Sequence, residues 1–151
     1  RLELPPESSV LQRLPPKFAD LCAASVRRSC GEVRVSEFQK AVGRTLRDIV
    51  GDNKFVAEEY EVSGHFMVDV ALPHDGICIE ADGPSHFQRD VHTRKYRENG
   101  ATRFKRRLLE TVGWRVVNVP FYTWDDFSSV QKTSWLKERI DLARNGDPQA
   151  I

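Results

Sequence analysis

The chain has 151 residues, of which 40% are hydrophobic and 30% are charged, and its formal net charge is +1. This balance is typical of one folded domain with a core; it excludes an intrinsically disordered chain, and no apolar run is long enough to span a membrane. The three cysteines, Cys22, Cys30 and Cys78, have no CxxC spacing, which indicates reduced thiols of an intracellular protein rather than a disulfide framework or a zinc site.

Residues 1–35 are predicted to be a linker followed by a lead-in helix. Four of the first 16 residues are prolines, which suits a linker, and the helix is expected over residues 18–28. The chain begins with Arg1 rather than a methionine, so we expect it to continue from an upstream segment that carries any targeting peptide.

A core-facing helix is predicted over residues 37–50, because Ser36 is a suitable N-cap and Gly51 a suitable stop. Its apolar residues recur at helical spacing: Phe38, Ala41, Val42, Leu46, Ile49 and Val50. The periodicity then changes to that of strands, which are predicted over residues 55–62, 66–72 and 77–82 with turns between them.

Acidic residues mark the end of the third predicted strand. Glu80 and Asp82 are two positions apart, so both carboxylates point to the same face of the strand. Asp69 lies in the preceding strand, and His86 follows the Gly83-Pro84 turn. Three carboxylates that converge need a compensating cation, which is the geometry of a divalent-metal nuclease site or of the remains of one.

The next segment, residues 88–100, has many charges and no apolar stripe, so we expect an exposed loop or a marginal helix. Thr102 is expected to cap a helix over residues 103–112. Phe104, Leu108 and Val112 are its predicted buried line.

A fourth strand is predicted over residues 114–119 and is expected to join the sheet in parallel through a right-handed crossover. An aromatic turn at residues 121–124 and a helix over residues 130–143 follow. The prediction is therefore one α/β domain over residues 36–143, a small mixed sheet flanked by helices, with residues 144–151 as a frayed tail.

The segment from Arg89 to Arg107 is strongly basic, with eight cations against Asp90 and Glu98. The cations are Arg89, Arg94, Lys95, Arg97, Arg103, Lys105, Arg106 and Arg107. A local excess of six positive charges in a nearly neutral chain favours contact with a phosphate backbone. The alternative is an ordinary solvated helix face, which charge runs usually are.

The run Ile79-Glu80-Ala81-Asp82-Gly83-Pro84-Ser85-His86-Phe87 resembles the opening signature of the RAP domain, an RNA-binding domain abundant in apicomplexan parasites. Later residues agree in order and spacing: Thr102, Lys105 to Leu109, Gly113 to Val117, Val119 to Phe121, Trp124, Trp135 and Leu136. The resemblance covers about Ile77 to Ile140.

This resemblance implies a PD-(D/E)xK (restriction-endonuclease-like) fold, close to very-short-patch-repair nucleases. RAP domains usually lie at the C-terminus of organellar proteins, as in the Fas-activated serine/threonine kinase-like proteins of mitochondria. The implied location is mitochondrial, with plastid as the alternative. The implied partners are RNA, either a transcript or ribosomal RNA, and ribosomal or RNA-processing proteins; no membrane is implied.

In the nuclease pattern, Asp69 and Glu80 fill the two acidic, metal-binding places, and Mg²⁺ would be the cofactor of an active enzyme. Asp82 stands where a water-orienting Lys is expected, which counts against a standard nuclease, although His86 has the chemistry of a base. In the simpler interpretation, Asp82 caps the turn, His86 bonds to backbone and Glu80 pairs with a basic residue.

Two aromatic residues near the sheet end, Tyr122 and Trp124, have the chemistry to stack on unpaired bases, although Trp124 is expected to pack in the core, as are Trp114 and Trp135. The first hypothesis is a non-catalytic RNA-binding domain. The second is a metal-dependent RNA endonuclease that uses Asp69, Glu80 and Asp82. A protein-interaction domain without salt-dependent RNA affinity is the third.

Overall fold

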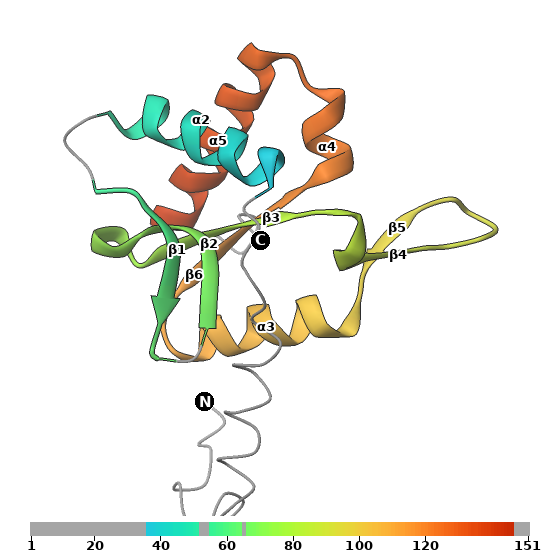
Figure 1. Ribbon diagram of the computed structural model, residues 1–151, viewed down its shortest axis with the longest axis horizontal. Coiled ribbons are helices and arrows are strands. Elements are labelled where there is room, and N and C mark those ends of the chain that lie inside the picture. The colour runs from blue at the N-terminus through green and yellow to red at the C-terminus, as the bar shows by residue number, and fades with distance from the viewer. Residues whose placement is uncertain (1–35, 52–54, 65, 147–151) are drawn as a thin grey trace, which may run out of the picture. The chain divides into compact units, whose positions relative to one another are not determined.

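The computed structural model describes residues 36–51, 55–64 and 66–146 (Figure 1). The chain divides into two compact units, residues 1–35 and 36–151, and the described residues belong to the second. The linker and lead-in helix predicted for residues 1–35 lie outside the described residues. None of the helices in these ranges is long and apolar enough to cross a membrane.

A four-stranded mixed sheet forms the centre of the domain, in the order β1-β2-β3-β6. Its strands are β1 (Ala57–Val62), β2 (Phe66–Leu72), β3 (Ile77–Asp82) and β6 (Arg115–Pro120). The pairs β1·β2 and β2·β3 are antiparallel, whereas β6 runs parallel to β3. The mixed sheet, its four strands and the parallel crossover were all predicted from the sequence, and the structure confirms them.

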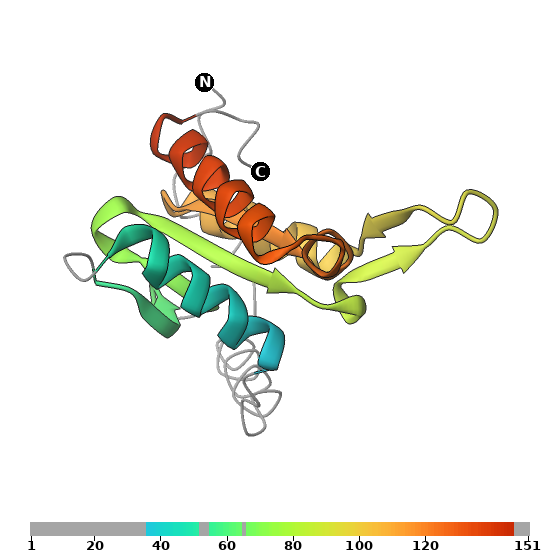
Figure 2. The ribbon, with the colours of Figure 1, turned by 90° about the horizontal axis from the view of Figure 1, so that it is seen from above.

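Helices cover both faces of the sheet (Figures 1 and 2). On one face lie α2 (Glu37–Val50), α4 (Phe121–Asp126) and α5 (Ser129–Arg144); on the other lies α3 (Gly100–Thr111). All six residues of β3 are buried, as expected of a strand that is covered on both faces.

The alternation of β3 assigns its side chains to the two layers. Ile77, Ile79 and Ala81 belong to the core under α2 and α5, whereas Cys78 belongs to the core that contains Leu109 of α3. Because side chains alternate along a strand, Glu80 and Asp82 lie on the α3 side of the sheet. That placement positions the site described below.

The long helices form where the sequence predicted them. Ser36 caps α2, where its hydroxyl accepts a hydrogen bond from the Gln39 amide, and α5 begins with a capping box of Ser128 and Gln131. Leu136 of α5 is fully buried. Trp114 and Trp135 are partly buried and pack against the cores, which agrees with their predicted packing role.

Two predictions for connecting segments are wrong. The charged segment after β3 is a β-hairpin of β4 (Phe87–Arg89) and β5 (Tyr96–Glu98), so only residues 90–95 between them form the expected exposed loop. The aromatic segment after β6 is the helix α4 rather than a turn. The hairpin and α4 pack against each other. Tyr96 of β5 stacks on Tyr122 of α4, with ring centroids 4.8 Å apart.

The predicted start and buried line of α3 are also wrong. Asn99, not Thr102, is the N-cap, and its side chain accepts a hydrogen bond from the Thr102 amide. Phe104 is 64% exposed and Val112 is 45% exposed, while Leu109 is fully buried. The helix turns a partly polar side toward the sheet because that side finds acidic partners there.

Candidate functional site

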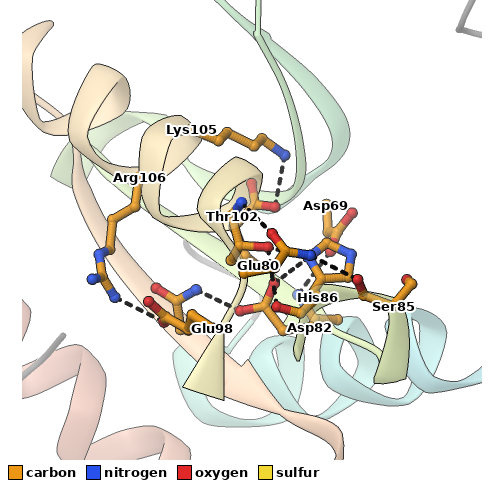
Figure 3. Close-up of polar contacts among 12 residues, drawn as sticks. Asp69, Glu80, Asp82, Ser85, His86, Glu98, Thr102, Lys105 and Arg106 are labelled. Atoms are coloured by element: carbon orange, nitrogen blue, oxygen red, sulfur yellow. Dashed lines mark hydrogen bonds and ion pairs between the residues drawn. The ribbon is translucent and has the colours of Figure 1, made fainter. Parts of the chain in front are cut away.

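A cavity of about 280 Å³ lies between the sheet and α3, lined by residues of β3, α3 and β6. The site residues Glu80, Asp82 and His86 line it, together with Lys105 and Asn118 (Figure 3). Parallel pairing of β3 with β6 sets Glu80 beside Asn118, which brings the acidic end of β3 under the helix.

Glu80 forms an ion pair with Lys105 across the cavity. The Lys105 Nζ donates to Glu80 Oε2 at 2.7 Å, and only 5% of Glu80 is exposed. Burial raises the pKa of Glu80 to about 7, although the neighbouring ammonium of Lys105 opposes that rise. The prediction that Glu80 pairs with a basic residue is confirmed, and the base comes from α3.

Two side chains contact the carboxylate of Asp82. Its Oδ1 lies 2.8 Å from His86 Nδ1, and its Oδ2 accepts a hydrogen bond from the side-chain amide of Asn118. Asp82 is 1% exposed. The hydrogen bond to Asp82 raises the pKa of His86, so the imidazolium form is favoured. Thr102 Oγ1 lies 3.2 Å from the same ring nitrogen. The expectation that His86 bonds to backbone is therefore wrong for its ring, which contacts the side chains of Asp82 and Thr102. The expectation that Asp82 caps the turn is also wrong, because its carboxylate contacts the side chains of His86 and Asn118.

Asp69 has a different role from the other two acids. The β2·β3 ladder ends at the pair Val70–Ile79, and beyond it the Ala81 amide donates to Asp69 Oδ2 at 2.7 Å. The carboxylate thus replaces a backbone carbonyl at the end of the ladder. Burial raises the pKa of Asp69, against the lowering effect of this hydrogen bond.

These side chains do not fit a preformed metal site. Among the described residues, no group of three or more His, Cys, Asp or Glu side chains is arranged to hold a metal ion. Lys105 and His86 occupy the positions against Glu80 and Asp82 that a cation would take. Glu80 Oε1 is buried and makes no hydrogen bond within the described part of the chain.

Two of the cations predicted to contact RNA, Lys105 and Arg106, pair with acids of the domain instead. Lys105 lies 2.7 Å from Glu80, and Arg106 lies 2.8 Å from Glu98. The sequence does contain a signal for the inward position of Lys105. Thr102, Lys105 and Leu109 are spaced at i, i+3 and i+7, which places them on one face of the helix.

Of the two alternatives for Trp124, base stacking and core packing, the structure supports the second. It is 4% exposed and packs against Phe38 of α2, with ring centroids 6.1 Å apart, and the Lys132 ammonium covers its ring at 5.4 Å. A ring so covered has no free face for a base. The prediction that Trp124 packs in the core is confirmed.

The other cations of the basic segment are exposed, although Arg89 also lies over the Tyr96 ring at 5.6 Å. They are Arg89, Arg94, Lys95, Arg97, Arg103 and Arg107, and all are exposed. Within the ranges that the structure describes, none of these six forms an ion pair with a carboxylate. Four belong to the β4–β5 hairpin, which extends away from the sheet (Figures 1 and 2).

The chain resembles known proteins over this part of its length. The family model of the RAP domain matches residues 79–139, from β3 into α5. A protein of Oryza sativa subsp. japonica named "RAP domain-containing protein, chloroplastic" is 38% identical over 92 residues. That region is 60% of this chain, and it spans 13% of the length of the relative. The resemblance to the RAP domain is thereby confirmed for the segment that contains every cavity residue named above.

Proposed function

We propose that residues 79–139 act as an RNA-binding RAP domain in an organellar protein, which holds RNA through phosphate contacts. The likeness to the RAP domain and the chloroplastic relative support this function. The relative's location favours an organelle, either a plastid or the mitochondrion. The RNA would be an organellar transcript or ribosomal RNA, bound together with ribosomal or RNA-processing proteins.

One observation carries this proposal: the basic segment separates into two sets. Lys105 and Arg106 neutralise buried or half-buried acids of the domain itself. The six exposed cations of the hairpin and α3 have no such partners among the described residues. Exposed arginines that protein acids leave unpaired gain affinity for phosphate by releasing its counterions.

The test is equilibrium binding of a labelled single-stranded RNA across a salt series. We expect affinity to fall with salt, since each phosphate contact on a single strand contributes a slope of roughly 0.7. The double variant Arg94→Ala/Arg97→Ala should bind more weakly and with a shallower slope. Arg44→Ala/Lys137→Ala removes the same charge from exposed positions on the opposite helical layer and should bind like wild type.

Equal losses in the two double variants would contradict the proposed surface and leave only the effect of net charge. An absence of salt-dependent RNA affinity in the wild-type protein would instead favour a protein-interaction domain. Both outcomes can be read from the same titrations.

For the fold, we propose a PD-(D/E)xK endonuclease-like domain. The order of helix, three antiparallel strands, helix and parallel strand supports it, as does the position of Asp69 and Glu80 on neighbouring strands. The amine of Lys105 reaches Glu80 from α3, so the acidic pair has a lysine beside it although β3 itself carries none.

That amine is the observation that favours a second candidate function, an RNA endonuclease that uses Asp69, Glu80 and Asp82 with Mg²⁺, and His86 as base. The test is incubation of labelled single-stranded and hairpin RNA with Mg²⁺ or Mn²⁺, with Asp69→Asn/Glu80→Gln as the control variant. Metal-dependent cleavage that this variant lacks would establish an enzyme. Equal RNA binding by both proteins, without cleavage, would leave a binding domain.

A further inference from the structure

An aromatic side chain lies exposed on the outer side of α3. Phe104 is 64% exposed, whereas Leu109, on the opposite side of the same helix, is fully buried. Transfer of an aromatic ring out of water is favourable, so an exposed ring on an ordered helix is available for a partner. Its position is therefore informative about what that partner is.

Open space also lies at the first turn of α3. A methyl group at Gly100 would meet no atom within 4 Å, so no side chain, that of Phe104 included, covers this position. Because Phe104 is 64% exposed, its ring keeps surface that a flat ligand can contact.

Two exposed arginines accompany this ring. Arg103 precedes it in the helix, and Arg107 lies one turn further on, at i+3, on the same outer side. The hairpin cations Arg94 and Arg97 precede the helix in the chain and are exposed as well. An apolar protein partner would have to desolvate these guanidinium groups, whereas a nucleic acid supplies a flat base for the ring and phosphates for the cations.

We propose that the outer face of α3 binds single-stranded RNA, with one unpaired base stacked on Phe104 and neighbouring phosphates held by Arg103 and Arg107. The inference rests on the proposed RNA-binding function and restricts the RNA ligand to single strands. Bases within a duplex are stacked on each other and offer no free face to a ring on a helix surface. Single strands expose such faces, and stacking tolerates any sequence.

The test compares Phe104→Ala, Phe104→Tyr and Val112→Ala in binding to labelled oligouridine, to the same backbone without bases, and to an RNA duplex. Loss of the ring should weaken oligouridine binding about tenfold, since base–aromatic stacking contributes about 1–3 kcal/mol per base. Phe104→Tyr keeps the ring and should retain the affinity. Val112→Ala shortens another exposed apolar side chain of the same helical segment and should bind like wild type.

The controls separate this inference from the proposed function. The base-free backbone and the duplex should bind wild type and Phe104→Ala equally. Salt-dependent oligouridine binding that Phe104→Ala leaves unchanged would overturn the stacking role while the RNA-binding function stands. A loss shared by the base-free backbone would also overturn it, and a wild type that binds no RNA would overturn the proposed function itself. Equal melting temperatures show that an affinity loss is not unfolding.

Discussion

The two sides of α3 have similar composition and opposite roles. The inner side carries Lys105, Arg106 and Leu109, and its two cations neutralise Glu80 and Glu98 of the domain itself. The outer side carries Arg103 and Arg107, which are exposed. Basic residues adjacent in the sequence therefore either pair with acids of the domain or stay exposed.

The buried acids Glu80 and Asp82 lie under the inner side of α3, whereas the proposed RNA surface is on its outer side and on the hairpin. The cavity beneath α3 contains two buried acidic side chains, of which Glu80 contacts Lys105 and Asp82 contacts His86. Carboxylates at this position would repel phosphate. The exposed cations of the hairpin and of the outer side of α3 form no ion pair with a carboxylate in the described ranges. Substitutions on the inner side should therefore change stability, and those on the outer side should change binding.

The largest effect is expected from Leu109→Ala, which removes the apolar anchor of the inner side. Truncation of a fully buried leucine should lower the free energy of unfolding by about 3 kcal/mol, because it loses burial and leaves a void. Urea denaturation measures this loss, and Val112→Ala is the exposed control, expected to lose under about 1 kcal/mol. Similar losses in both variants would contradict the assignment of the inner side.

Lys105→Met should cost about 2 kcal/mol at pH 8, since it leaves the Glu80 carboxylate buried without its counter-charge. The partial exposure of the lysine keeps the cost below that of a fully buried pair. At pH 6 the loss should be smaller, because Glu80 then holds a proton. Arg103→Met is the matched outer variant, and an equal loss there would show that Lys105 has no special role.

Glu80→Gln should change how stability depends on pH. The folded-state pKa of Glu80, about 7, lies above its ordinary value of 4.5, so its stabilising contribution is complete below pH 4.5 and is lost as pH rises through 7. The raised pKa of His86 acts in the same direction at higher pH. Relative to wild type, the variant should therefore gain of the order of 1 kcal/mol between pH 5 and pH 8. Parallel stability curves over that range would refute this assignment.

The smallest effect on stability is expected from Arg94→Ala/Arg97→Ala in the hairpin. Both residues are exposed, so the free energy of unfolding should change by less than about 0.5 kcal/mol while RNA affinity falls. Urea denaturation checks that stability is unchanged, and RNA binding measured on the same preparation checks that affinity falls. A large loss of stability would show that the hairpin cations support the fold, which would contradict their place on the proposed RNA surface.

The sequence by itself determined the elements with strong local signals. The capped, amphipathic α2, the strands β2 and β3, the parallel β6 and the final helix all follow from periodicity and from cap and turn residues. The acidic end of β3 could be predicted as well, because the i, i+2 spacing of Glu80 and Asp82 places both side chains on one face of the strand.

Only the tertiary structure decided which side of α3 faces inward. The apolar spacing of Phe104, Leu108 and Val112 is a valid helical stripe, but burial of Leu109 together with the ion pair of Lys105 to Glu80 outweighs it. Glu80 is 25 positions earlier in the chain, so no local pattern shows that the lysine will find it there. The β4–β5 hairpin also depends on tertiary structure. Each of its strands has only three residues, which is too few for a recognisable sequence pattern, and aromatic packing on α4 holds them in place.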